Sequence, residues 1–102
     1  MSEIPNIQLI GAKVLSEDEK ESVYSIATEY YAKIYKKMRD MSALVVHIKT
    51  SEKQVKSKLY EIKSRAVSPS SVVESREESR ELPQAVADSF EKIMHEIDHK
   101  KK

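Results

Sequence analysis

The sequence contains no cysteine and a single glycine, Gly11, and this composition excludes several classes of protein. Without cysteine the chain can form no disulfide framework, no thiolate metal site and no cysteine nucleophile. With one glycine it can form no glycine-rich loop of the kind that cradles nucleotide phosphates. The stability of the fold must therefore come from the packing of apolar side chains.

Long hydrophobic runs and a large excess of charge are also absent. No apolar run approaches the roughly 20 residues that cross a bilayer, and the N-terminus lacks the pattern of a signal peptide, so we expect a cytoplasmic protein with no membrane partner. Lys and Arg number 18 and Asp and Glu 17, a formal net charge of +1. Any attraction to nucleic acid must come from local clusters. The length predicts a single small domain, residues 1–102.

The first third of the chain predicts a strand followed by a long helix. The β-branched residues of NIQLIGAKV (6–14) are typical of a strand that ends or bulges near Gly11. Ser16 and Glu19 match a capping box, which predicts that a helix begins at about Glu17 and continues to about Arg39. Its apolar stripe at helical spacing consists of Val23, Ile26, Ala27, Tyr30, Ile34 and Met38.

The rest of the chain predicts two or three further strands and a second helix. ALVVHIKT (43–50) predicts a strand, SEKQ (51–54) a polar turn, and residues 55–67 a third strand, with the side chains of Tyr60, Ile62, Ser64 and Ala66 on one face. Residues 67–81, serine-rich around Pro69, are either a mobile loop or a weak fourth strand near 71–76, and we favour the strand. A second helix, with Pro83 in its first turn, is predicted to continue to about His99. Its apolar stripe at helical spacing consists of Leu82, Val86, Phe90, Ile93 and Ile97. This order predicts an α+β fold, a mixed sheet with both helices packed on one face.

Residues 95–99, HEIDH, match the H-E-x-x-H motif of zinc proteases. The apolar stripe of the predicted helix places His95 and His99 on the opposite face, toward water. A zinc protease needs this helix inside the enzyme and usually a third ligand downstream, whereas only three lysines follow here. We therefore expect no metal site, no cofactor and no metalloprotease activity.

The remaining residues with catalytic chemistry form no recognisable arrangement. No serine lies in a G-x-S-x-G motif, because the chain has only one glycine. His47 alternates with Val46 and Ile48, which predicts a solvated or partly packed side chain on the other face of the sheet. We expect no catalytic residues and a protein that is not an enzyme.

Basic residues concentrate at the end of the first predicted helix, along the second and third strands and at the end of the chain, whereas acidic residues concentrate at 17–21 and 74–81. This asymmetry favours a positive surface for phosphate backbones, and Tyr24, Tyr31 and Tyr35 either stack on bases or complete the core boundary. The alternative is that the lysines complement a helix dipole and keep strand edges soluble. The candidate RNA-binding residues are Lys33, Lys36, Lys37, Arg39, Lys49, Lys56, Lys58, Lys63, Arg65, Lys100, Lys101 and Lys102.

The chain resembles the short bacterial ribosome hibernation-promoting factors and ribosome-associated inhibitors, whose strand, helix, three-strand, helix order resembles a double-stranded-RNA-binding domain. Residues 6–38 are similar to that family's opening strand and long helix with a basic end, and ALVVHIKTSEK (43–53) is similar to its second strand. Residues 80–102 are similar to its last helix, where an apolar stripe ends in a His- and Lys-rich tail.

The resemblance implies a stress-response protein that inhibits translation by occupying the decoding channel of the small ribosomal subunit, where it contacts ribosomal RNA and excludes tRNA and mRNA. The implied contacts are Lys33, Lys36, Lys37, Arg39 and Lys100 to Lys102. SPSSVVESREES (68–79) departs from the family's regular strands, and acidic residues 74–81 would repel RNA from a shared face. The alternative function is a non-enzymatic protein interaction module, or a homodimer formed through an exposed sheet or edge strand. Basic residues that share one face would favour RNA binding, and scattered ones the interaction module.

Overall fold

The computed structural model describes residues 5–54 and 57–100. Its first strand, β1 (Ile7–Ile10), ends at Gly11, which begins the short 3-10 helix η1 (Ala12–Val14). Gly11 has a φ of 83°, and a Cβ atom there would collide with the backbone carbonyl of Ile48 on a neighbouring strand. The chain's only glycine therefore lies where any side chain would be strained.

The first helix, α1 (Glu17–Lys37), begins with the predicted capping box. The Glu19 backbone N–H donates to Ser16 Oγ at 3.2 Å, and the Ser16 N–H donates to the Glu19 carboxylate at 2.9 Å. These bonds satisfy two backbone donors at the start of the helix. The helix ends at Lys37 rather than at the predicted Arg39, because Met38 already has non-helical backbone angles.

The central strands are β2 (Ala43–Gln54), β3 (Ser57–Val67) and β4 (Val72–Ser79). The predicted polar turn at 51–54 is wrong, because these residues continue β2 and pair with the beginning of β3. Backbone ladder bonds need no apolar side chains, so a polar composition does not end a strand that has a partner. The expected strand in the serine-rich segment is present as β4. The first two residues of the predicted third strand, at 55–56, lie outside the described residues.

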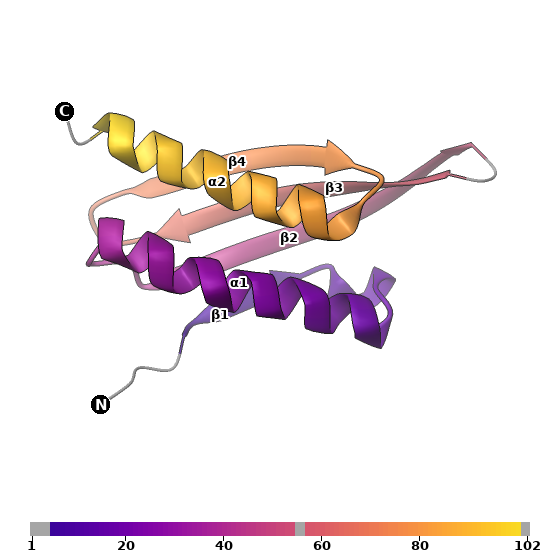
Figure 1. Cartoon of the computed structure of the whole chain (residues 1–102), viewed down its shortest axis with the longest axis horizontal. Helices are drawn as coiled ribbons and strands as arrows, with labels where there is room; N and C mark the ends of the chain where they lie inside the picture. The colour runs from indigo at the N-terminus through magenta and orange to yellow at the C-terminus, as the bar shows by residue number, and fades with distance from the viewer. Residues whose placement is uncertain (1–4, 55–56, 101–102) are drawn as a thin grey trace.

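The sheet has the strand order β1-β2-β3-β4, with β1 parallel to β2 and the other neighbours antiparallel. The second helix, α2 (Leu82–Lys100), lies beside α1, and both cover the same face of the sheet (Figure 1). The two helices run parallel, so their C-terminal ends lie at the same end of the molecule (Figure 1). This arrangement confirms the predicted α+β fold.

The core lies between the helices and the inner face of the sheet. The predicted alternation in β3 is confirmed, since Tyr60, Ile62, Ser64 and Ala66 are buried. The buried hydroxyls of Ser64 and Ser89 are hydrogen-bonded at 2.7 Å, which joins β3 to α2 inside the core. The opposite face of the sheet, called the open face below, is covered by no element among the described residues. Neither helix carries an apolar stretch long enough to span a bilayer within the described part of the chain.

Candidate nucleic-acid interface

Four of the predicted RNA-binding residues form one group, the helix-end cluster, at the C-terminal end of α1: Lys33, Lys36, Lys37 and Arg39. Lys33 Nζ lies 4.7 Å from the centroid of the Tyr30 ring and 3.9 Å from Glu29 Oε2. The Lys33 side chain nevertheless remains half exposed to solvent. Lys36 and Arg39 are also exposed, so three of the four cations are accessible to a ligand.

Lys37 differs from the other members of the helix-end cluster because it makes a structural contact. Its Nζ lies 2.7 Å from Asp98 Oδ1, and this ion pair joins the last turn of α1 to α2. The carbonyl ends of two parallel helices meet here, and each carries a partial negative charge that basic side chains stabilise. Part of the positive charge at the C-terminal end of α1 therefore stabilises the fold.

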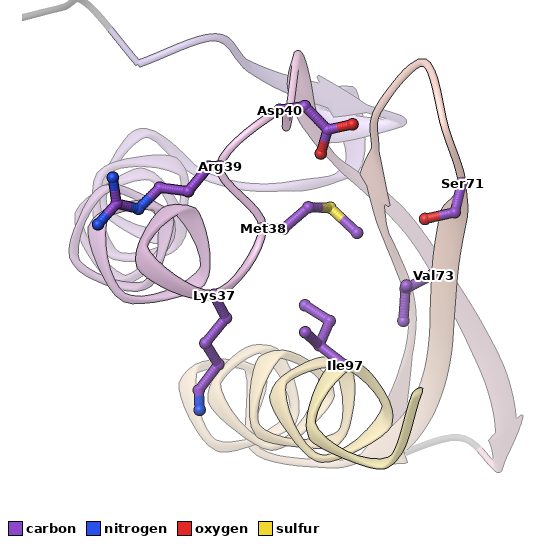
Figure 2. A pocket seen from close by; sticks show the side chains of 7 residues that line it. All are labelled: Lys37, Met38, Arg39, Asp40, Ser71, Val73 and Ile97. Atoms are coloured by element: carbon purple, nitrogen blue, oxygen red, sulfur yellow. The ribbon is translucent and has the colours of Figure 1, made fainter. Parts of the chain in front are cut away.

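A pocket of about 200 Å³ opens beside the helix-end cluster (Figure 2). Met38, Val73 and Ile97 point into it and form an apolar floor, whereas the Arg39 side chain points away from its centre (Figure 2). The rim carries charges of both signs, from Lys37, Arg39 and Asp40. This pocket is therefore less suited to a phosphate than the exposed cations around it. Its remaining lining residue is Ser71.

A second group of predicted residues, Lys49, Lys63 and Arg65, lies on the open face of the sheet. Their side chains alternate with the buried residues of β2 and β3 and are exposed. His47 shares this face and is partly exposed, as its alternation predicts. Arg76 of β4 lies there too, directly opposite Lys63. Sequence reasoning missed Arg76, because the register between β3 and β4 decides which residue lies beside Lys63.

One other predicted residue, Lys58, has a described side chain, and it belongs to neither group. Lys58 lies on the helix side of the sheet, with its Nζ 5.7 Å from the centroid of the Tyr60 ring, near the beginning of α1. Lys100 is the last residue of α2, and the side chains of Lys56, Lys100, Lys101 and Lys102 lie outside the described part of the structure. The candidate residues therefore occupy both faces of the molecule and do not share one.

Acidic residues of β3 and β4 neutralise some of this charge. Glu74 accepts a hydrogen bond from Arg65 Nε at 2.9 Å on the open face, and Glu61 Oε1 lies 3.8 Å from Arg76 Nη2. Glu77 lies on the helix side, where its carboxylate is 2.5 Å from Lys92 Nζ. Part of the acidic segment 74–81 thus shares a face with basic residues, which the sequence analysis considered, and partly pairs with them.

The structure shows whether the histidines of HEIDH and the tyrosines of α1 are exposed or packed. His95 and His99 are exposed, as predicted, and within the described part of the chain no three His, Cys, Asp or Glu side chains gather as metal ligands. The rings of Tyr31 and Tyr35 lie parallel with centroids 6.2 Å apart and pack against the core, so they complete its boundary. Tyr24 remains 47% exposed.

Comparison with known proteins identifies a structural relative. No protein-family profile and no curated protein sequence matches the chain. Among solved structures, the fold is similar to that of a ribosomal subunit interface protein from Coxiella burnetii, with a TM-score of 0.60. The likeness covers 94% of both chains at 13% sequence identity. It therefore establishes a shared fold over nearly the whole chain.

Proposed function

We propose that the chain is a ribosome-associated RNA-binding factor that inhibits translation from the small ribosomal subunit. The observation that carries this proposal is the likeness of fold to a ribosomal subunit interface protein over 94% of both chains. That likeness agrees with the resemblance of this sequence to the hibernation factors. The proposal assigns the chain no catalytic step.

The helix-end cluster supplies the RNA contacts in this proposal. Lys33 and Lys36 are exposed on the last two turns of α1, and Arg39 is exposed just beyond its end. Charges more than about 8 to 10 Å away are largely screened at physiological ionic strength, so a phosphate senses the local cluster rather than the net charge of +1. Each phosphate contact releases counterions from the RNA, which favours binding without sequence readout.

Co-sedimentation with purified small ribosomal subunits tests the proposal. The variant carries Lys33→Glu, Lys36→Glu and Arg39→Glu and retains Lys37, because Lys37 joins the helices through Asp98. We expect the wild type to sediment with the subunits at low salt and the variant to remain at the top of the gradient. Surface substitutions usually change stability by under about 0.5 kcal/mol each, so the helix content should be unchanged.

The matched control carries Lys13→Glu, Lys20→Glu and Arg80→Glu, which change the charge by the same amount. These residues lie in η1, in the first turns of α1 and just before α2, at the opposite end of the helices. We expect the control to sediment like the wild type. If both variants lose binding equally, net charge rather than the helix-end cluster governs it, and wild-type protein that never sediments contradicts the ribosome proposal.

One observation favours the alternative of a protein interaction module or homodimer. The basic residues occupy two faces, and β4 is an edge strand of the sheet. That edge is partly protected, because Lys92 Nζ donates a hydrogen bond to the Arg76 backbone carbonyl at 3.2 Å. Sedimentation velocity without ribosomes separates the two functions. A concentration-dependent dimer that does not bind subunits would support the alternative.

A further inference from the structure

The open face of the sheet contains a hollow of about 160 Å³ that the helix-end cluster does not reach. Five side chains from three strands line it: His47, Lys49, Glu61, Lys63 and Arg76. Three are cations, one is an imidazole and one is a carboxylate. The lining is thus strongly biased toward positive charge on a protein whose net charge is only +1.

The strand register explains why these side chains converge. His47 on β2 lies directly opposite Lys63 on β3, and Lys63 lies directly opposite Arg76 on β4. Neighbouring strands lie about 4.8 Å apart, so the Cα atoms of this row span roughly 10 Å, within the reach of long side chains. Lys49, opposite Glu61 in the next row, completes the lining.

The row that contains Lys63 and Arg76 is electrostatically unfavourable. Like charges directly opposite each other on a sheet are destabilising, whereas opposite charges stabilise it. The next row follows the favourable rule, because Arg65 lies opposite Glu74 and pairs with it at 2.9 Å. Lys63 and Arg76 do not follow it. Among the described residues that line the hollow, one is a carboxylate, Glu61, and it lies 3.8 Å from Arg76 Nη2. A bound anion would relieve this repulsion.

We propose that the hollow binds a phosphate group, with Lys63 at its centre and with Lys49, His47 and Arg76 around it. Lys and Arg side chains are the usual donors to phosphate oxygens, and convergence from three strands offers donors from several directions. The phosphate belongs either to an RNA backbone or to a free phosphate compound. The first source deepens the proposed function and rests on it, whereas the second does not.

Glu61 has a definite role in this proposal. Its carboxylate lies 3.8 Å from Arg76 Nη2, where it competes with a phosphate for that guanidinium group. Glu61→Gln removes a negative charge from the lining and should strengthen phosphate binding several-fold. Glu74→Gln makes the same change in charge on the same face, outside the hollow, where Glu74 pairs with Arg65. It should have a clearly smaller effect.

Titration of isotope-labelled protein, followed by NMR, tests the site with two probes: inorganic phosphate and a single-stranded RNA oligonucleotide without terminal phosphates. We expect saturable shifts of the backbone amides of His47, Lys63 and Arg76 with at least one probe. Loss of a charge-assisted hydrogen bond should make Lys63→Gln bind that probe about tenfold more weakly. Arg65→Gln removes the same charge on the same strand and face, but Arg65 is already paired with Glu74, so it should weaken binding clearly less than Lys63→Gln does.

The outcomes separate the sources and the two proposals. Saturation by RNA alone identifies a backbone phosphate, and saturation by inorganic phosphate that RNA does not displace identifies a free phosphate compound. The site is overturned if neither probe shifts these amides, or if Lys63→Gln and Arg65→Gln weaken binding equally. If wild-type protein binds phosphate here but never sediments with small subunits, the proposed function is contradicted and the phosphate site in the hollow is supported.

Discussion

At the scale of single residues, Tyr60 and Glu19 make the contact with the clearest consequence for stability. Tyr60 Oη donates to Glu19 Oε2 at 2.6 Å, which joins β3 to the first turn of α1. This hydrogen bond, with a second from the Ser16 backbone N–H, lowers the pKa of Glu19 below its ordinary value of 4.5. The same bond, together with burial, raises the pKa of Tyr60 from 10.0 to about 12.

These shifts predict how Tyr60→Phe changes stability with pH. The lowered pKa of Glu19 gives a contribution that is present above pH 4.5 and is lost as the pH falls through the folded value. The raised pKa of Tyr60 gives one that is fully present below pH 10.0 and is lost as the pH rises toward about 12. We expect Tyr60→Phe to lower the free energy of unfolding by about 1 to 3 kcal/mol at pH 7, and by less at both extremes.

Urea unfolding at several pH values measures this difference. Tyr24→Phe is the matched control, because Tyr24 is 47% exposed, and it should change stability little at any pH. A Tyr60→Phe penalty that stays constant from pH 3 to pH 12 would contradict this prediction, because the contribution of the hydroxyl would then not depend on the ionisation of Glu19 and Tyr60.

At the scale of elements, the helices were more predictable than the strand ends. The capping box at Ser16 and the apolar stripe of α2 are local patterns, and both helices follow them closely. The extension of β2 through 51–54 depends on pairing with β3, which no local pattern contains. The hollow was missed for the same reason. Alternation placed Lys63 on the correct face, but only the register shows that Arg76 and His47 lie beside it.

The rotational position of α2 makes a prediction about its two faces. Phe90 is fully buried and His95 is exposed. Truncation of a buried aromatic side chain usually costs about 3 to 5 kcal/mol, so Phe90→Ala should remove much of the stability of the domain. His95→Ala should cost less than about 0.5 kcal/mol. Similar losses for both variants in denaturant titration would contradict the position of the helix, and with it the solvent-facing HEIDH segment.

At the scale of the whole molecule, positive charge occupies two faces of a thin two-layer domain. The helix-end cluster lies on the helix side, and the cations of the hollow lie on the open face. A flat RNA surface could contact only one of them. A site that encloses the protein, such as the decoding channel that the sequence resemblance implies, could contact both. The distribution of basic residues over two faces, which favours an interaction module if the RNA surface is flat, is therefore compatible with binding inside a channel.

The central claim is that this chain binds the small ribosomal subunit through phosphate contacts. The most direct test measures the affinity of labelled protein for purified small and large subunits over a series of salt concentrations. We expect saturable binding that is at least about tenfold tighter to the small subunit. Three phosphate contacts predict a slope of log K against log salt of about −2 or steeper. Equal affinity for both subunits, or an affinity for the small subunit that does not change with salt, would contradict the account.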